Sequence, residues 1–290
     1  MIDPNLVTPA IITGLALGSM YALAALGLTL QWGVLKVLNF SHGAFITCGG
    51  YIAWLVLGAS GGNYLAALPA AMIIPFFMGF VLYRIVILPL QGKKESETNI
   101  FIATLATGLI LENLIIIFIG GRYKGLPTIV PGFTNILGTI INNQHILLMF
   151  LGPLCLGILM FFLVKTRSGM AVRAVAQDNV GAAIVGIESK KVYAYTVAIG
   201  SALAGFAGVL LGAYYFLSPT MGGAPLVTAL FVMVLGGMGS IKGTIYGAYI
   251  IGLVDAFARF FVGAFWAEPI LFVIFILVIL FRPQGLYGVK

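Results

Sequence analysis

The chain has 290 residues, of which 61% are hydrophobic and only 8% are charged, and its mean hydropathy is +1.12. Soluble domains carry about 25% charged residues, so this composition excludes an ordinary cytosolic enzyme, a disordered chain and a secreted disulfide scaffold. The formal net charge is +7, but the Lys and Arg residues form no single stripe, which argues against a nucleic-acid partner. We therefore expect an all-α, polytopic protein of the lipid bilayer.

A helix that crosses a membrane needs about 20 mostly apolar residues. Eight apolar runs are long enough to be predicted as spans. A ninth, residues 226–236, is too short to cross alone, and it is either re-entrant or the first part of a broken helix. The sequence predicts about 8–9 spans in a single transmembrane domain, residues 1–290. The long predicted spans are residues 6–30, 43–59, 64–88, 99–119, 145–164, 193–216, 244–262 and 268–281.

The basic residues predict the orientation, because Lys and Arg concentrate in cytoplasmic loops. With the N-terminus outside, most of them share one side, which is then the cytoplasm. This parity requires the run 226–236 to reach the inner side. Residues 165–192 are the largest inner loop, and residues 120–144, with several Gly and Pro, are an outer loop. The predicted inner residues are Lys36, Lys93, Lys94, Lys165, Arg167, Arg173, Lys190, Lys191, Lys242, Arg282 and Lys290.

No catalytic pattern stands out in the sequence. The two His and two Cys residues lack metal-ligand spacing, and no G-x-x-x-x-G-K-[ST] phosphate loop is present. We expect that the chain is not an enzyme, holds no metal and binds no cofactor itself. Pairs of glycines four residues apart indicate close helix packing instead. These pairs are Gly14 with Gly18, Gly208 with Gly212, and Gly243 with Gly247.

Charges inside predicted spans are expensive and therefore informative. Asp255 and Arg259 are four residues apart, which places both on one helix face as a structural ion pair. Glu112, followed by Asn113, lies near the middle of another span. It is either a residue of a solute pathway or a hydrogen-bond partner between helices.

The polar segment Asn39–Gly43 interrupts an apolar region between the first two spans. One interpretation is a broken helix, whose free backbone groups hold small polar or zwitterionic solutes in transporters. Asn39, Ser41 and His42 are then candidate pathway residues. The other interpretation is an interfacial turn in which Ser41 caps the second span.

The inner loop 165–192 contains apolar residues near helical spacing, broken at Gly186. This pattern predicts a short amphipathic helix at the cytoplasmic face. The helix either docks on the membrane surface or inserts into the groove of a partner protein. Its candidate contact residues are Arg173, Ala176, Gln177, Asp178, Ala183, Gly186 and Ile187.

Four motifs, in order along nearly the whole chain, resemble the permeases of ATP-driven branched-chain amino acid importers of the LivH type. Each motif is weak alone, but four in register are specific. They are Gly27–Leu30 with Gly33–Gly43, Arg173–Asn179 with Val185–Ile187, Gly236–Ser240 with Gly243 and Gly247, and Phe281–Leu286.

The resemblance implies a subunit of the bacterial inner membrane that pairs with a second, related permease. Two cytoplasmic ATPase subunits would hydrolyse the ATP, and a periplasmic binding protein would deliver the amino acid. Residues 173–187 would form the coupling helix, although Val175-Ala176-Gln177 replaces the Glu-Ala-Ala triplet of other importers. Related permeases move urea or short amides, so these solutes are an alternative to the amino acid. Outside this family, the alternatives are a secondary transporter driven by an ion gradient, and a membrane enzyme or assembly subunit.

Overall fold

The computed structural model describes residues 4–136 and 139–288, so the predicted inner position of Lys290 lies outside the described residues. Within these ranges, eight helices are long and apolar enough to cross a membrane. This confirms the prediction of an all-α polytopic fold. The crossing helices are α1 (Pro4–Leu35), α2 (His42–Ala59), α3 (Tyr64–Leu82) with its continuation, α5 (Ser96–Phe118), α6 (Asn143–Lys165), α9 (Ser189–Tyr214), α11 (Ile241–Phe261) and α12 (Ala264–Phe281). The continuation of α3 is a π-helical turn, Tyr83–Ile87, followed by the short α4, Leu88–Leu90.

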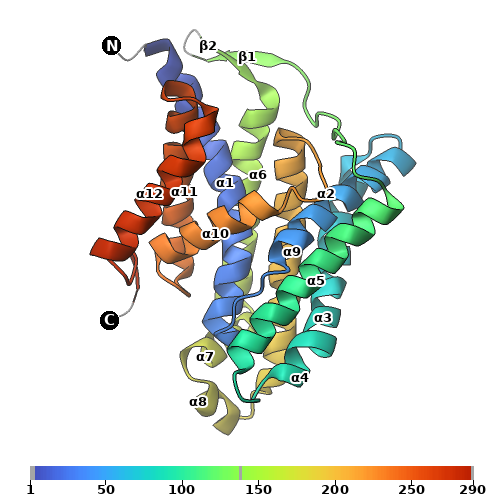
Figure 1. Cartoon of the computed structure of the whole chain (residues 1–290), viewed down its shortest axis with the longest axis vertical. Coiled ribbons are helices and arrows are strands. Elements are labelled where there is room, and N and C mark those ends of the chain that lie inside the picture. Colours follow the sequence, from blue (N-terminus) through green and yellow to red (C-terminus); the bar gives the residue numbers. More distant parts are fainter. Residues whose placement is uncertain (1–3, 137–138, 289–290) are drawn as a thin grey trace.

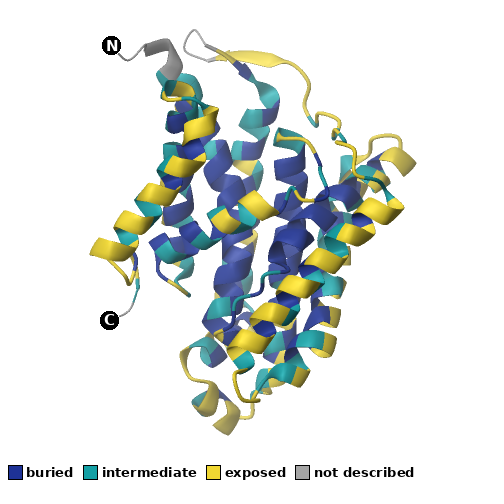
Figure 2. Cartoon of the chain, in the orientation of Figure 1, coloured by how far each residue is buried: buried dark blue, intermediate teal, exposed yellow. Residues whose placement is uncertain are grey.

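Helices α1 and α9 form the centre of the bundle, and α5 and α12 lie on its outside (Figures 1 and 2). The most apolar stretches of α1 and α9 are 83% and 89% buried, whereas that of α12 is 11% buried. The two central helices are rich in Gly and Ala, which permit close approach, while α12 carries large apolar side chains. Large apolar side chains on an outer face are stable when lipid surrounds them.

Helix α11 packs antiparallel on α1 through glycines. A Cβ atom added to Gly252 would lie 2.3 Å from the backbone nitrogen of Gly18, and one added to Gly14 would lie 2.8 Å from Leu253. At the other end of the interface the hydroxyls of Thr29 and Thr244 are 2.8 Å apart. The interpretation of Gly14 and Gly18 as packing residues is therefore confirmed.

The short apolar run that the sequence left open forms α10 (Gly223–Gly236). The turn after α10 places Gly239 against Gly33, near the C-terminal end of α1. The C-terminal segment closes the same turn, since the Leu286 amide donates to Leu235 O and the Tyr287 amide to Gly236 O. The chain thus crosses from the end of α9 to the opposite end of the bundle through a non-helical segment followed by α10, which is the equivalent of a ninth crossing.

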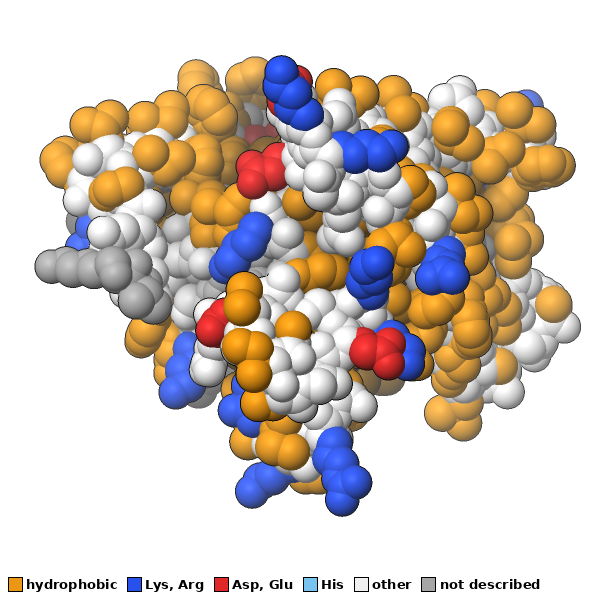
Figure 3. Space-filling model, turned by 90° about the horizontal axis from the view of Figure 1, so that it is seen from below, with side chains coloured by type: hydrophobic (Ala, Val, Ile, Leu, Met, Phe, Trp, Pro, Cys, Tyr) orange, Lys and Arg blue, Asp and Glu red, His pale blue; other side chains and the backbone are white. Residues whose placement is uncertain are grey.

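The two ends of the bundle differ. One end carries the N-terminus of α1 and a two-stranded antiparallel hairpin, β1 (Phe133–Ile136) and β2 (Thr139–Asn142), within a region predicted only as a loop (Figure 1). The other end carries α7 (Arg167–Gln177) and α8 (Asn179–Ile184) and displays Lys and Arg side chains at many points (Figure 3). This distribution agrees with the orientation that the basic residues predict.

We expect Gly252→Ala to destabilise the protein by about 1–3 kcal/mol, because the new methyl group meets backbone atoms of α1 that cannot move aside. Gly157→Ala on the open face of α6, where an added Cβ meets nothing within 4 Å, is the matched control. It should leave stability unchanged or raise it by up to about 1 kcal/mol. Thermal unfolding of the detergent-solubilised protein measures both, and equal losses would contradict the packing argument.

Candidate functional site

The first helix break, Lys36–Ser41, runs from the end of α1 back into the bundle as non-helical chain. Asn39 organises it, because its Oδ1 atom accepts hydrogen bonds from the Ser41 amide at 3.1 Å and from the Ser41 hydroxyl at 2.5 Å. Ser41 immediately precedes α2, but its hydroxyl makes no capping bond to that helix. The alternative of an interfacial turn capped by Ser41 is therefore wrong.

His42, the first residue of α2, is fully buried. Its Nε2 atom lies 2.9 Å from the carbonyl oxygen of Ala24, in the middle of α1. Gly27 makes room for the ring, since a Cβ atom there would lie 2.5 Å from the imidazole. Helix α2 therefore begins at about the middle depth of the bundle. Asn39, Ser41 and His42 are each at most 1% exposed, so a solute would reach them only after a conformational change.

A second helix break lies opposite the first. After α9 ends at Tyr214, the segment Tyr215–Gly222 descends into the bundle before α10 begins. The Gly222 amide donates to the Thr47 hydroxyl at 3.0 Å, and a Cβ atom on Gly222 would overlap the carbonyl oxygen of Gly43. Helices α2 and α10 thus begin side by side and run to opposite ends of the bundle. Only glycine permits this approach.

Sequence reasoning missed the position of this second break. The signal was the sequence Ser218-Pro219-Thr220-Met221-Gly222-Gly223, which precedes the apolar run. Pro and Gly together interrupt helices, yet their contact with residue 43 depends on tertiary packing. The second break supplies no charged side chain, so a search for charges inside spans does not find it.

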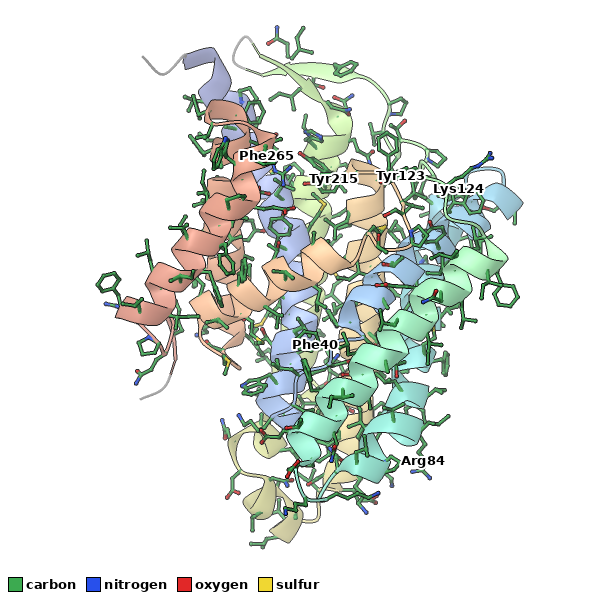
Figure 4. All side chains as sticks on the ribbon, in the orientation of Figure 1. Phe40, Arg84, Tyr123, Lys124, Tyr215 and Phe265 are labelled. Carbon is green, nitrogen blue, oxygen red and sulfur yellow. The ribbon has the colours of Figure 1, made fainter. Side chains whose placement is uncertain are left out.

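Helix α5 packs against the first break. The Thr104 hydroxyl accepts a hydrogen bond from the Phe40 amide at 3.2 Å, and the rings of Phe40 and Phe101 meet edge to face at 4.5 Å. Gly108 follows one turn later, where an added Cβ atom would lie 3.4 Å from the Cα atom of Ser41. Figure 4 shows Phe40 in the lower half of the bundle, between the ribbons of α1 and α5. Helix α5 therefore covers the first break.

The two predicted polar residues of α5 occupy different positions. Glu112 lies one turn beyond Gly108 and is half-buried, and the structure gives its carboxylate no hydrogen bond to the described residues. Asn113 is exposed, and its amide donates to the Leu109 carbonyl within the same helix at 2.7 Å. The structure therefore brings Glu112, but not Asn113, onto the stripe of α5 that borders the first break.

Asp255 and Arg259 form the ion pair that their spacing predicts, with Arg259 Nε 2.8 Å from Asp255 Oδ1. Asp255 is fully buried, and its second oxygen accepts a hydrogen bond from the Tyr21 hydroxyl at 2.7 Å. The Arg259 guanidinium also lies 5.9 Å from the centre of the Tyr215 ring, the first residue of the second break. The pair therefore links α1 and α11 to the descending segment.

The inner loop forms two helices where the sequence predicts one. Asp178 separates them, because its extended backbone ends α7 and its carboxylate caps α8 by accepting from the Val180 amide at 2.9 Å. Val172 and Val175 of α7 face the bundle, so the predicted single apolar ridge is wrong. Instead, α8 and the following turn expose Val180, Ile184 and Val185, whose exposed fractions are 69%, 80% and 75%. We call these three residues the α8 knob.

The predicted contact residues of this loop surround the α8 knob. Gly186 adopts a positive φ of 87°, which terminates the knob and favours glycine. Ala176 and Ile187 are half-buried, and the others are exposed. The exposed ones are Arg173, Gln177, Asp178, Ala183 and Gly186.

The described residues contain no cluster of three or more His, Cys, Asp or Glu side chains that could hold a metal ion. Cys48 and Cys155 are both buried as free thiols.

Comparison with known proteins points to permeases of branched-chain amino acid transport systems. The model of the family described as branched-chain amino acid transport system / permease component matches residues 10–281. The chain is 32% identical to the high-affinity branched-chain amino acid transport system permease protein BraD of Pseudomonas aeruginosa, over 96% of this chain and 94% of BraD. It is 30% identical to LivH of Escherichia coli, over 95% and 93% of the two chains. It is 26% identical to LivM of the same organism, over 98% of this chain and 71% of LivM.

The hydrogen bond from Gly222 to Thr47 joins the second break to α2, the helix that follows the first break, and generates a prediction. Thr47→Val removes the acceptor and leaves a buried amide unsatisfied, so we expect a loss of about 1–3 kcal/mol in stability. Thr47→Ser keeps the hydroxyl and should restore most of that loss. Thermal unfolding of the two variants separates the bond from the side-chain volume, and equal stability of both would contradict the role assigned to Thr47.

Proposed function

We propose that this chain, which belongs to the branched-chain amino acid transport system permease family, is the membrane permease subunit of an ATP-driven importer. Its solute is a branched-chain or similar amino acid, carried inward across the bacterial inner membrane. The observation that carries the proposal is the meeting of two helix breaks inside a multi-pass bundle. Broken helices at the middle of a membrane are where transporters bind small polar solutes.

The partners follow from the same proposal. A second, related permease pairs with this chain, which the similarity to both LivH and LivM supports. A periplasmic binding protein delivers the solute, and two cytoplasmic ATPase subunits bind and hydrolyse the ATP. This chain is a single transmembrane permease domain that is no enzyme and holds no cofactor, and nucleic acid has no part in its function.

The α8 knob is the element through which the ATPase subunits act. Three exposed apolar side chains at the basic end of the bundle are unfavourable in water and suit an apolar groove on a partner. Their helix is anchored to the bundle, because α7, directly before it, buries Val172 and Val175 against the core. A displacement of the knob is therefore transmitted to the helices that α7 contacts, which include α1, α6 and α9.

The mechanism is alternating access. The fully buried positions of Asn39, Ser41 and His42 correspond to a state closed at the first break. ATP and the loaded binding protein bind preferentially to different states of the bundle, and this difference in affinity shifts the equilibrium between them. Opening requires α2, α5 and α10 to separate around the breaks. Glu112, which borders that region, is then a pathway residue.

Two other functions predict a different solute or a different energy source. A permease for urea or short amides would use the same architecture. A secondary transporter driven by an ion gradient would need a free acid in the membrane, a role that Glu112 could fill, whereas Asp255 is paired. Purification of the tagged chain from its native membrane separates these cases. Two ATPase subunits and a second permease should accompany it, and a chain that purifies alone and moves solute without ATP would overturn the proposal.

Ala183→Arg tests the coupling segment. The added charge lies beside the α8 knob and cannot enter an apolar groove, so solute-stimulated ATP hydrolysis of the reconstituted transporter should fall by about tenfold or more. Thr98→Arg, on the exposed start of α5 at the same end of the bundle, is the matched control and should retain activity. Unchanged stimulation in the Ala183 variant would exclude this contact.

Glu112→Gln tests the pathway. The substitution keeps the shape of the side chain and removes its charge, so we expect a severalfold change in uptake affinity or rate. Uptake into proteoliposomes driven by ATP gives both quantities. If neither changes, Glu112 serves only helix packing.

A further inference from the structure

A cavity of about 220 Å³ lies apart from the first break, between α1, α9, α10, α11, α12 and the segment that leads into α10. A cavity of this size has room for several water molecules or a small organic solute. Figure 4 shows Tyr215 and Phe265, the latter at the start of α12, in the upper half of the bundle. The side chains that line the cavity include Tyr21, Leu211, Tyr215, Met221, Arg259, Glu268 and Leu271.

Arg259 presents an unused edge to this cavity. Its Nε atom bonds to Asp255, but the structure gives its two terminal amino groups no acceptor among the described residues. Asp255 fixes the guanidinium in place, and Asp255 is itself held by a hydrogen bond from the Tyr21 hydroxyl. Guanidinium groups bind carboxylates through two parallel N–H bonds. A carboxylate in the cavity could therefore bind to Arg259 without displacing Asp255.

Glu268 supplies the opposite charge. It stands in the second turn of α12 and lines both this cavity and an adjoining one of about 450 Å³. In the described part of the chain its carboxylate forms no ion pair, and the Arg259–Asp255 pair is complete without it. An unpaired carboxylate in a helix that faces lipid is costly unless a cation approaches it.

The remaining walls are apolar and end at a helix start. Leu211, Met221 and Leu271 face the cavity, together with Ala224 in the first turn of α10. First-turn amides have no acceptor within their own helix, and they favour negative charge. One cavity thus combines a guanidinium edge, a free carboxylate and an apolar wall.

We propose that this cavity is a subsite that binds a small apolar α-amino acid as its zwitterion. The carboxylate of the amino acid binds to Arg259 near the start of α10, its ammonium group binds to Glu268, and its apolar side chain packs on Leu211, Met221 and Leu271. The proposal rests on the proposed function and adds the residues that select a zwitterion. Because Tyr215 and Met221 belong to the second break, an occupied subsite contacts the segment that opens in alternating access.

The test measures binding of radiolabelled leucine to the assembled transporter in nanodiscs, without the periplasmic binding protein. Unlabelled leucine, leucinamide and 4-methylpentanoate are used as competitors. Leucinamide lacks the carboxylate, and 4-methylpentanoate lacks the ammonium group. We expect leucine to bind at least about tenfold more tightly than either analogue. Glu268→Gln should abolish the preference over 4-methylpentanoate, and Arg259→Lys the preference over leucinamide.

Matched controls lie far from the cavity. Glu97→Gln at the start of α5 and Arg84→Lys in the π-helical turn, which Figure 4 shows near the opposite end of the molecule, should keep the wild-type ratios. Glu268 is exposed, so its variant does not threaten folding. Equal binding of the three compounds to the wild-type protein, or wild-type ratios in the Glu268 variant, would overturn the subsite.

Import of leucine with ATP and the binding protein distinguishes the two proposals. If the wild-type transporter imports leucine but binds the three compounds equally, the subsite fails and the proposed function stands. If it imports neither a branched-chain nor a similar amino acid, both proposals fail.

Discussion

The second non-helical segment ends in the interior of an apolar bundle against the first turn of α2, at the contact between Gly222 and Gly43, directly after the first break. Unsatisfied backbone groups cost several kcal/mol in such surroundings, so irregular chain is stable there only when protein groups bond to it. Thr47 accepts the Gly222 amide, Thr104 accepts the Phe40 amide, and Asn39 accepts the Ser41 amide. The positions of α2, α5 and α10 follow from these bonds.

The second break also connects regions that are distant in the sequence. Leu217 pairs with Lys124 of the outer loop through two backbone hydrogen bonds, of 3.0 and 2.8 Å. Tyr215 lies against Arg259, and Gly222 lies against the first turns of α2. A rearrangement of the outer loop would therefore move the segment Tyr215–Gly222, and this segment contacts the middle of the bundle. This arrangement suits a protein whose solute arrives from the side of that loop.

The opposite end of the bundle is built differently. There α7 is packed against the core while the α8 knob protrudes, because Asp178 stops one helix and caps the next. A single continuous helix would have kept its apolar residues on one side and buried them together. The separation leaves three apolar side chains available to a partner and keeps their base fixed, which is the geometry that transmission of a force requires.

The sequence by itself determined the membrane location, the eight long crossing helices and the Asp255–Arg259 pair. Hydropathy and the i, i+4 spacing are local properties, and they are unambiguous in a chain with few charges and many apolar residues. It also indicated the first break, where Asn39, Ser41 and His42 stand together in an apolar region. Only the tertiary structure decided that a second break meets the first, that His42 binds to the middle of α1, and that Arg259 and Glu268 share a cavity. These features join residues on different helices, and whether such residues meet depends on how glycine-rich helix faces pack, which local composition does not specify.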